Sequence, residues 1–412
     1  MAKRALSPAW LLGILTGLNL FNYLDRFVVS AVLSPLQTEF KVGDGDIAEL
    51  NTIFMIGYFV TSPIFGFLGD RFSRKWLIAI GIFVWSLGTV LTGFAGSFAQ
   101  LLWFRILVGV GEASYATISP SLISDAYPPS RRNNALTIFY VAIPVGAALG
   151  NIIGGVMAER YGWRWAFIWA GAPGLLLALV LLPFAESERG QAEQKSSEKP
   201  RLGDVTGLFR SPNYCLVVAG YTAYTFALGA FGVWGPTFLH RVHGVSVEAS
   251  GTFFGSVLVV AGLLGTLLGG LLASAWQKKN PAGYASMLCL SVFTAAPIAV
   301  LSFWATNKST SMSCLALAMF FIFLCTGPVN TLILETVPLN LRASAMAVSI
   351  FAIHLFGDIW SPRIVGRLSD HWNSLQSAVM ILPGALAAAA VFWFVLMLRM
   401  RRSAFPLPSQ AT

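Results

Sequence analysis

Charged side chains are scarce in this sequence: they make up 11% of its 412 residues, whereas hydrophobic side chains make up 56%. Soluble domains carry about 25% charged residues, so the composition excludes an ordinary water-soluble fold. In place of charge the chain has long apolar segments, each near the roughly 20 residues with which an α-helix crosses a membrane. Segments such as 255–273 are continuously apolar or small, without the alternation of barrel strands. We therefore predict an all-α membrane protein.

Cysteine is also rare, and its positions do not form a recognisable site. Cys215, Cys289, Cys314 and Cys325 fall inside predicted helices, without the pairing of a disulfide framework or the spacing of metal ligands. The HExxH, GxSxG and Walker-loop patterns of metalloproteases, serine hydrolases and P-loop ATPases are absent as well. We expect no metal, no catalytic residues, no enzyme activity, no ATP-driven step and no cofactor.

Twelve apolar segments can be placed, six before and six after a polar stretch at 185–210. They are 9–36, 47–68, 76–96, 98–122, 134–157 and 165–184, then 213–239, 250–273, 283–305, 312–334, 344–367 and 374–398. The predicted organisation is an N-terminal six-helix bundle (1–184), a cytoplasmic linker (185–210), a C-terminal six-helix bundle (211–402) and a cytoplasmic tail (403–412). The first segment carries charges at its centre, so we expect a retained span and not a signal peptide.

The positive-inside rule explains the formal net charge of +9 better than nucleic-acid binding, which we do not expect. If the N-terminus is cytoplasmic, its side collects Lys3, Arg4, Arg71, Arg74, Lys75, Arg131, Arg132, Lys278, Lys279, Arg342, Arg399, Arg401 and Arg402. The opposite loops hold Lys41, Arg160, Arg164, Arg241 and Lys308, diluted by Glu39, Asp44, Asp46 and Glu49. We expect a multi-pass protein of the inner (cytoplasmic) membrane of a cell, with both termini in the cytoplasm.

The two halves are faintly similar to each other. The stretch LISDAYPPSRRNNA at 122–135 aligns with LILETVPLNLRASA at 332–345, matching acid, Pro, Arg and Ala at one constant offset. GFLGDRFSRK at 66–75 has a weaker echo in GLLASAWQKK at 270–279, where Ser274 stands in place of the acid. Such matches favour a duplicated six-helix unit, with substrate bound near the membrane midplane between the halves.

The motif at 66–75 resembles the signature of the major facilitator superfamily. In that signature, glycines permit close helix approach, while a carboxylate and cations form a charge cluster that latches one conformation. The resemblance implies a conformational gate formed by Gly66, Asp70, Arg71, Arg74 and Lys75, together with Asp125 and Arg131 after the fourth span. The alternative is a basic stop sequence that only sets topology, although such a loop needs neither the acid nor the glycines.

In the first half, four ionisable residues lie in the interior of predicted spans, where each is expensive and calls for a functional explanation. In the second half the interior charges are fewer, with Asp358 on the eleventh span. Asp25 and Arg26 are central in the first span, and Arg105 and Glu112 lie two helical turns apart on the fourth. We interpret the arginines as fixed positive charge for a substrate, and Asp25 or Glu112 as the group that gains and loses a proton when exposure alternates. A static ion-pair network that only fixes helix packing is the alternative, but buried pairs add little net stability.

Other candidate substrate-binding residues are polar or aromatic: Asn22, Tyr115, Tyr221, Tyr224, Asn330 and His354. Taken alone, a residue such as Tyr221, Tyr224 or Asn330 is more often part of ordinary helix packing in a bilayer than of a binding site. A histidine such as His354 is likewise more often a satisfied buried side chain than a proton carrier. On the fifth span, Gly146, Gly150, Gly154 and Gly155 form a small-residue stripe that lets a neighbouring backbone approach closely, either for sliding or for static packing.

The first half further resembles one branch of the superfamily, the Spinster family, whose members include lysolipid and sphingosine-phosphate exporters. The resemblance is carried by NYLDRF at 22–27, GFLGDRFSRK at 66–75, RILVGVGEASYATISPSLISD at 105–125 and IFYVAIPVG at 138–146. It implies that Asp25, Arg26, Arg105 and Glu112 govern substrate binding and proton coupling. The second half matches less distinctly.

The expected function is secondary active transport of an amphiphile, lysolipid or sphingoid-phosphate-like, by alternating access driven by a proton gradient. The expected partners are this substrate, protons and membrane lipids, and the expected state is a monomer. Transport of a small organic anion or drug, an uncoupled scramblase or channel, and a transporter-like receptor are the alternatives. Saturable flux that depends on a pH gradient would separate the first class from the channel.

Overall fold

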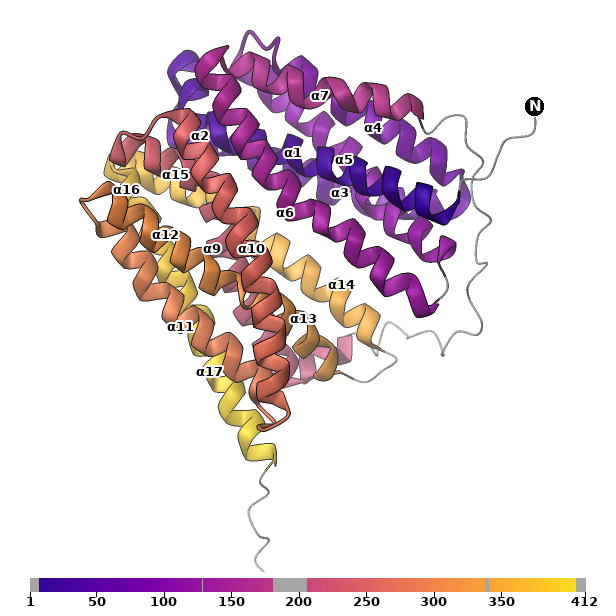
Figure 1. Cartoon of the computed structure of the whole chain (residues 1–412), viewed down its shortest axis with the longest axis vertical. Coiled ribbons are helices and arrows are strands. Elements are labelled where there is room, and N and C mark those ends of the chain that lie inside the picture. Colours follow the sequence, from indigo (N-terminus) through magenta and orange to yellow (C-terminus); the bar gives the residue numbers. More distant parts are fainter. Residues whose placement is uncertain (1–6, 128, 181–205, 338–340, 405–412) are drawn as a thin grey trace, which may run out of the picture. The chain divides into compact units, whose positions relative to one another are not determined.

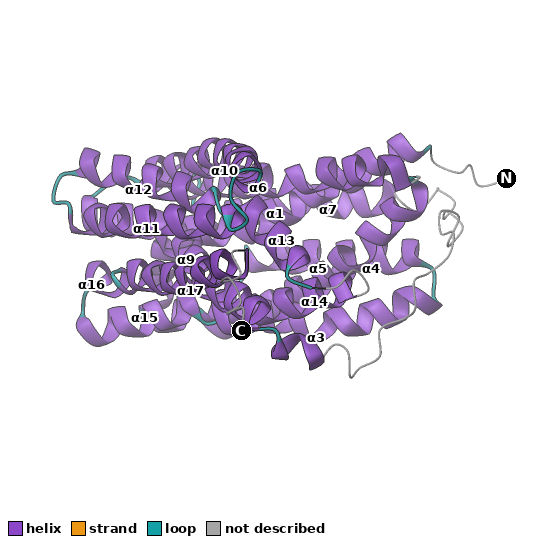
Figure 2. Ribbon diagram, turned by 90° about the horizontal axis from the view of Figure 1, so that it is seen from below, coloured by secondary structure: helices purple, strands orange, loops and turns teal. Residues whose placement is uncertain are grey.

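The computed structural model describes residues 7–127, 129–180, 206–337 and 341–404. In these residues every regular element is a helix, and Figures 1 and 2 show the helices with their short connections. The predicted linker lies outside the described residues as far as 205, and the predicted tail lies outside them from 405 onward.

The first half of the chain forms six helical segments, one for each predicted span. They are α1 (Pro8–Phe40), the short α2 (Asp44–Ile47) continued by α3 (Glu49–Arg71), α4 (Arg74–Thr92), α5 (Phe98–Ala126), α6 (Pro129–Arg160) and α7 (Trp163–Val180). Ser7 and Ser97 cap α1 and α5, because each side chain accepts a hydrogen bond from a backbone N–H of the first turn. Lys41 ends α1 in the left-handed conformation, with φ of 53°.

The second half also forms six segments, three of which are interrupted. They are α9 (Pro212–His243, after η1 at Leu208–Arg210), α10 (Val247–Gln277), α11 (Gly283–Trp304), α12 (Lys308–Phe323) with α13 (Thr326–Glu335), α14 (Arg342–Ile353) with η3 (His354–Asp358) and α15 (Ser361–Trp372), and α16 (Leu375–Val379) with α17 (Ile381–Ala404). Pro328, which has no N–H to offer the preceding turn, follows the break between α12 and α13. The π-helical turn η3 places one extra residue in its helix.

These segments have the length and composition of membrane spans. Ten of them in the described residues are long and apolar enough to cross a membrane, and α1 and α7 bring the number to twelve. Large apolar side chains point outward, among them Trp103 (68% exposed), Leu271 (67%) and Phe293 (68%). Hydrocarbon, and not water, is the solvent that suits such a surface. The predicted twelve-helix count is confirmed.

The chain divides into two compact units. Unit 1 comprises Met1–Lys195 with Pro236–Ser256, and unit 2 comprises Ser196–Gly235 with Val257–Thr412. In unit 1, α1 packs along α6, α3 and α4 pack against α5, and α4 packs against α7. In unit 2, α11 packs against α12 and α17.

The predicted glycine stripe explains the close packing of α1 against α6. A Cβ atom on Gly146 would lie 2.5 Å from the Leu20 carbonyl oxygen, and one on Gly150 would collide with the Leu24 carbonyl oxygen. Only glycine leaves room for backbone at these positions. The expected close approach of a neighbouring backbone is therefore confirmed, and it fixes α1 in the middle of unit 1, where Asp25 and Arg26 lie.

Candidate functional site

The centre of unit 1 holds an ion pair between α1 and α5. Arg26 donates two hydrogen bonds to the same carboxylate oxygen of Glu112, from Nη2 at 2.7 Å and from Nε at 3.3 Å. The Glu112 side chain is completely buried, whereas 18% of the Arg26 side chain is exposed. Arg26 is therefore the member of the pair that an outside molecule can reach.

Asp25, the neighbour of Arg26, points to a different partner, as adjacent residues on a helix must. Its Oδ2 accepts a hydrogen bond of 2.9 Å from the Thr89 hydroxyl on α4, and both residues are buried. Among the described residues, Asp25 Oδ1 and Glu112 Oε1 have no hydrogen-bond partner. Each buried carboxyl group thus retains one oxygen at which a proton could be carried.

Arg105 is the most enclosed charge of the cluster, at 2% exposure. Its Nε donates to the Leu50 carbonyl oxygen at 3.4 Å, and its guanidinium carbon lies 4.7 Å from the centre of the Phe54 ring. This fixed cation offsets the charge of the two carboxylates from inside the bundle.

Aromatic rings on α1 and α3 surround Arg26, and the sequence analysis did not include them. The guanidinium carbon lies 4.9 Å from the ring centres of Tyr23 and Phe54 and 5.3 Å from that of Tyr58. Cation–π contacts of this kind stabilise a cation by about 0.5–2 kcal/mol. Phe54 and Tyr58 stand one helical turn apart, a spacing that was visible in the sequence but without any sign that Arg26 would face it.

The predicted wall residues have several different environments. Tyr115 donates to the Leu15 carbonyl oxygen, and Tyr224 donates to the Ile322 carbonyl oxygen at 3.1 Å, so both buried hydroxyls join helices. Asn22 is buried on α1, one turn before Arg26. These contacts favour packing for both tyrosines.

In unit 2 the remaining candidates are less enclosed. Asn330 donates to the Thr326 carbonyl oxygen within α13 at 2.9 Å, and Tyr221 interacts with both Asn330 and Asp358. His354 Nδ1 lies 2.9 Å from Asp358 Oδ1, across the π-helical turn. The structure thus places Tyr221 and His354 near one acid, Asp358, and Asn330 beside Tyr221.

Two residues of the predicted gate meet directly. Arg74, at the start of α4, forms an ion pair of 2.6 Å with Asp125 at the end of α5. Lys75 Nζ lies 5.5 Å from the ring centre of its neighbour Trp76. Gly66 has room for a Cβ atom, which would lie 3.6 Å from the nearest atom of Thr117. Asp70 and Arg71 lie in the last turn of α3 and Arg131 lies in α6, with side chains outside the described part of the chain.

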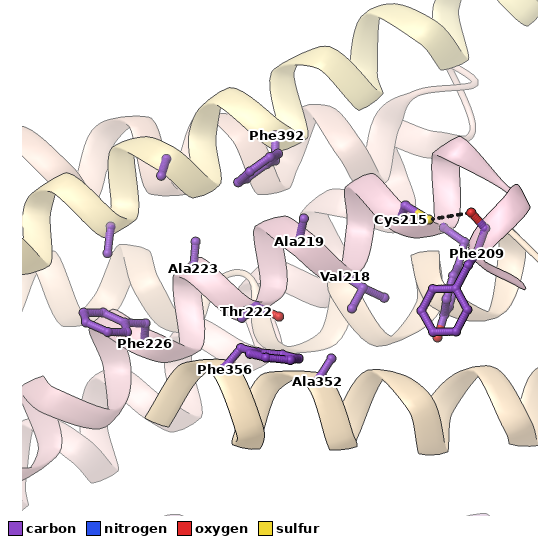
Figure 3. A pocket seen from close by; sticks show the side chains of 13 residues that line it. Phe209, Cys215, Val218, Ala219, Thr222, Ala223, Phe226, Ala352, Phe356 and Phe392 are labelled. Carbon is purple, nitrogen blue, oxygen red and sulfur yellow. Dashed lines mark hydrogen bonds between the residues drawn. The ribbon is translucent and has the colours of Figure 1, made fainter. Parts of the chain in front are cut away.

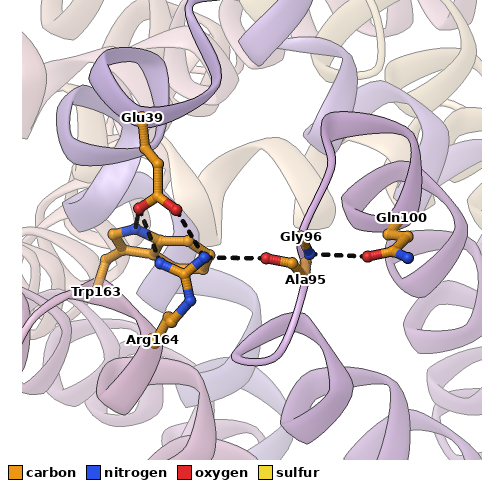
Figure 4. A network of polar contacts seen from close by, with 6 residues as sticks. All are labelled: Glu39, Ala95, Gly96, Gln100, Trp163 and Arg164. Atoms are coloured by element: carbon orange, nitrogen blue, oxygen red, sulfur yellow. Dashed lines mark hydrogen bonds and ion pairs between the residues drawn. The ribbon is translucent and has the colours of Figure 1, made fainter.

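A second polar network fixes the opposite end of unit 1 (Figure 4). Glu39 accepts hydrogen bonds from Trp163 Nε1 at 2.7 Å and from Arg164 at 2.6 Å and 2.8 Å. Arg164 also donates to the Ala95 carbonyl oxygen at 3.1 Å, which ties α7 to the loop after α4. The Arg164 guanidinium lowers the pKa of Glu39 below its usual value, chiefly by hydrogen bonding.

Further ion pairs at this end hold the segment Pro236–Ser256 within unit 1. Arg241 pairs with Asp44 at 2.5 Å, and Arg160 pairs with Glu248 at 2.7 Å. Close backbone packing accompanies them, because a Cβ atom on Gly255 would lie 2.6 Å from the Ala148 carbonyl oxygen.

Comparison with known proteins shows which family has this architecture. The model of the Major Facilitator Superfamily matches residues 15–362. The protein spinster of Drosophila melanogaster is 35% identical over 87% of this chain, which spans 61% of that protein. The sphingosine-1-phosphate transporter SPNS2 of Danio rerio is 33% identical over 95% of this chain and 84% of its own length. The chain belongs to the Spinster family of the major facilitator superfamily.

The solved structures agree on the fold. A bacterial homologue of the human lysosomal transporter Spinster, crystallised in an inward-facing and unoccupied conformation, matches with a TM-score of 0.88 at 23% identity, over 98% of this chain and 99% of that one. The predicted fold, two pseudo-symmetric six-helix bundles of the major facilitator type, is confirmed. As a Spinster-family member the protein is a multi-pass membrane transporter and not an enzyme, which confirms those predictions and the resemblance to the family.

Proposed function

We propose that this transporter moves an amphiphile with an anionic head group, lysolipid or sphingoid-phosphate-like, by alternating access coupled to protons. The observation that carries the proposal is the Arg26–Glu112 pair, which combines a completely buried carboxylate with a partly exposed guanidinium. The name of the zebrafish relative, a sphingosine-1-phosphate transporter, supports a phosphate-bearing substrate.

Charge balance connects the proton to the substrate. With both carboxylates ionised, Asp25 and Glu112 offset Arg26 and Arg105, so the cluster is neutral. A proton on Glu112 removes the partner of Arg26 and leaves the cluster with one net positive charge. Arg26 can then form a bidentate contact with a phosphate or carboxylate head group, for which guanidinium has the matching geometry. Head group and Glu112 thus compete for one cation, and proton binding favours substrate binding.

Asp25 is the second candidate for the proton. Thr89 holds one of its oxygens, and a change in this contact during the conformational cycle would alter how well α4 supports the ionised form. The Arg74–Asp125 pair belongs to the proposed gate, because it joins the start of α4 to the end of α5 and can hold these two helices in one arrangement.

The proposed orientation places the end of unit 1 that bears Arg74 and Lys75 in the cytoplasm, with both termini. In unit 2, the exposed Lys278, Lys279, Arg399, Arg401 and Arg402 are assigned to the same side. The proposed location is the inner (cytoplasmic) membrane of a cell, with the protein acting as a monomer.

The test is uptake of labelled sphingoid phosphate and lysophospholipid into proteoliposomes, with and without an imposed pH gradient. We expect saturable, gradient-dependent uptake that Glu112→Gln abolishes while the variant stays monodisperse. Glu39→Gln, at a carboxylate that is 40% exposed near the end of α1, is the matched control and should transport normally.

Other outcomes assign the steps differently. If the dependence of uptake on the pH gradient survives Glu112→Gln but is lost in Asp25→Asn, Asp25 and not Glu112 is the residue that carries the proton. Flux of either lipid that neither saturates nor responds to the gradient would indicate a scramblase. If neither lipid moves, the amphiphile is the wrong substrate, and small organic anions become the next class to test.

A further inference from the structure

Unit 2 contains an apolar groove that takes no part in the charged site. It is lined by η1 and α9 together with residues of α14, η3 and α17, and has a volume of ≈ 610 Å³. Its floor is built largely from alanines, whereas phenylalanines form the rim (Figure 3). The rim residues Phe209 and Phe356 are 65% and 66% exposed, so the groove opens on the outer surface of unit 2. A volume of this size lies within the range of small-molecule sites.

The groove has the length of one membrane leaflet. Along α9 its lining runs from Tyr214 to Phe226, which are twelve positions apart, or about 18 Å at the helical rise. Half of a hydrocarbon core roughly 30 Å thick is about 15 Å. The groove thus follows a single leaflet, from the start of α9 to near its middle.

Polar groups in the lining are few and mostly engaged. The Tyr214 hydroxyl donates to the Ala345 carbonyl oxygen at 2.8 Å, and Cys215 Sγ donates to the Phe209 carbonyl oxygen at 3.3 Å. A ligand with several hydrogen-bonding groups would lose its water here without replacement. A hydrocarbon chain has no hydrogen bonds to lose, and it fills a groove whose walls otherwise lack dispersion contacts.

The end of the groove at Phe209 and Cys215 is strongly basic. Arg210 is exposed next to Phe209, and Arg399 Nε on α17 donates to Asn213 Oδ1 at 3.3 Å, directly before Tyr214. Arg401 and Arg402 are exposed in the last turn of α17. The sequences 206–235, 342–357 and 375–404, which contain the lining, have no Asp or Glu. The opening therefore suits an anionic head group.

We propose that this groove binds one acyl chain of a resident anionic phospholipid, whose phosphate is held by Arg210, Arg399 and Arg402. Arg399 and Arg402 follow the lining residues Phe392 and Ala388 by two and four helical turns, on the same face of α17. The occupant comes from the leaflet next to the basic end of unit 2, and the site is separate from the substrate-binding cluster of unit 1. Basic residues beside an apolar surface are the usual requirements for recognising anionic lipids.

A second apolar groove supplies the matched control. It lies on another face of α17, has a volume of ≈ 540 Å³ and includes Cys289, Phe293 and Ala387. Basic residues are absent from both linings, but only the first groove extends to η1, where Arg210 is exposed. Ala388 lines the first groove and the adjacent Ala387 lines the second, and both are exposed. Ala388→Trp and Ala387→Trp therefore add the same bulk at neighbouring positions, one in each groove.

The experiment is native mass spectrometry of the full chain in mild detergent, titrated with phosphatidylglycerol or phosphatidylcholine of identical acyl chains. We expect one phosphatidylglycerol to bind about tenfold or more tightly than phosphatidylcholine, since each nearby arginine favours an anionic head group. Ala388→Trp should remove this bound lipid and Ala387→Trp should keep it. Arg210→Gln/Arg399→Gln/Arg402→Gln should reduce the preference to near unity, whereas Lys278→Gln/Lys279→Gln should leave it unchanged.

Equal binding of the two lipids, or equal behaviour of the two tryptophan variants, would overturn the proposal. Stoichiometric displacement of the bound lipid by a sphingoid phosphate would also overturn it, by making the groove a substrate site. If Ala388→Trp does not remain monodisperse, Ala388→Leu and the arginine variant provide the same comparison. Uptake of the amphiphile is measured separately, so its failure would leave the lipid site standing.

Discussion

Removing either partner of the Arg26–Glu112 pair should have unequal effects on stability. Arg26→Met leaves a completely buried carboxylate without its cation, and breaking a buried pair in this way costs about 3–5 kcal/mol. Glu112→Gln leaves Arg26 partly exposed and still packed against the rings of Phe54 and Tyr58. A lost charged hydrogen bond costs about 1.5–3 kcal/mol, so we expect the smaller loss in Glu112→Gln.

The difference should also depend on pH, with a definite sign. The stranded carboxyl group in Arg26→Met can be neutralised by a proton, which Glu112 in the unfolded chain does not hold above a pH of about 4.3. A folded state that binds one more proton than the unfolded state gains stability as pH falls, by up to about 1.4 kcal/mol per pH unit. Glu112→Gln has no such group and should show no corresponding slope.

The assay is the free energy of unfolding by titration with sodium dodecyl sulfate in mixed micelles, measured for wild type and both variants between pH 6 and pH 8. These pH limits are about two and four units above the pKa of about 4.3 that Glu has in an unfolded chain, so the carboxyl group of the unfolded state is ionised throughout. Equal destabilisation of the two variants, with the same dependence on pH, would refute the charge reasoning and make the pair an ordinary packing contact.

Three further predictions concern packing, hydroxyls and surface charge. Gly146→Ala should destabilise unit 1 by about 1–3 kcal/mol, because its Cβ meets the Leu20 carbonyl oxygen. Gly17→Ala, with open space around it, should be neutral or slightly stabilising. The free energies of unfolding of the two variants, measured by titration, test this difference. Tyr115→Phe and Tyr224→Phe should each lower the free energy of unfolding by about 0.5–1.5 kcal/mol, because each hydroxyl binds a backbone carbonyl oxygen. The KM of transport should stay unchanged, and a raised KM would show that the tyrosine contacts the substrate. The lowered pKa of Glu39 stabilises the folded state above the unfolded value of about 4.3, and this contribution is lost as pH falls through the folded pKa. Because both partners are 40% exposed, Glu39→Gln should cost only about 0.5 kcal/mol at pH 7, and its stability curve should meet that of wild type in acid.

The spans were predictable because they depend on a property that is local in the sequence. Each predicted apolar segment coincides with a helix, and the close approach at Gly146 and Gly150 could be expected from spacing alone. The interruptions were not predictable in the same way. The π-helical turn at His354–Asp358 depends on how its helix is packed, and hydropathy does not report an extra residue in a turn.

The candidate site was only partly predictable for a related reason. A buried charge is visible in a sequence because it breaks an apolar run, which singled out Asp25, Arg26, Arg105 and Glu112. Its partners are not visible, because Thr89, Phe54 and Tyr58 are ordinary residues of membrane helices and are selected only by the fold. Conversely, the sequence alone suggested that the hydroxyls of Tyr115 and Tyr224 could bind a substrate. In the structure each hydroxyl instead donates a hydrogen bond to a backbone carbonyl oxygen of a neighbouring helix.

The proposed mechanism gives the two arginines of the cluster different functions, in agreement with their different surroundings. Arg105 is 2% exposed and bound to the Leu50 carbonyl oxygen, so it cannot leave its place without exposing an unpaired backbone group. Arg26 is more exposed, and its partner Glu112 is one that a proton can switch off. The rings around Arg26 support its charge in either state, because a cation–π contact does not depend on the protonation of a carboxylate. In the proposed mechanism, a head group that replaces Glu112 therefore meets a cation that is already oriented, and Arg105 keeps the remaining carboxylate balanced throughout.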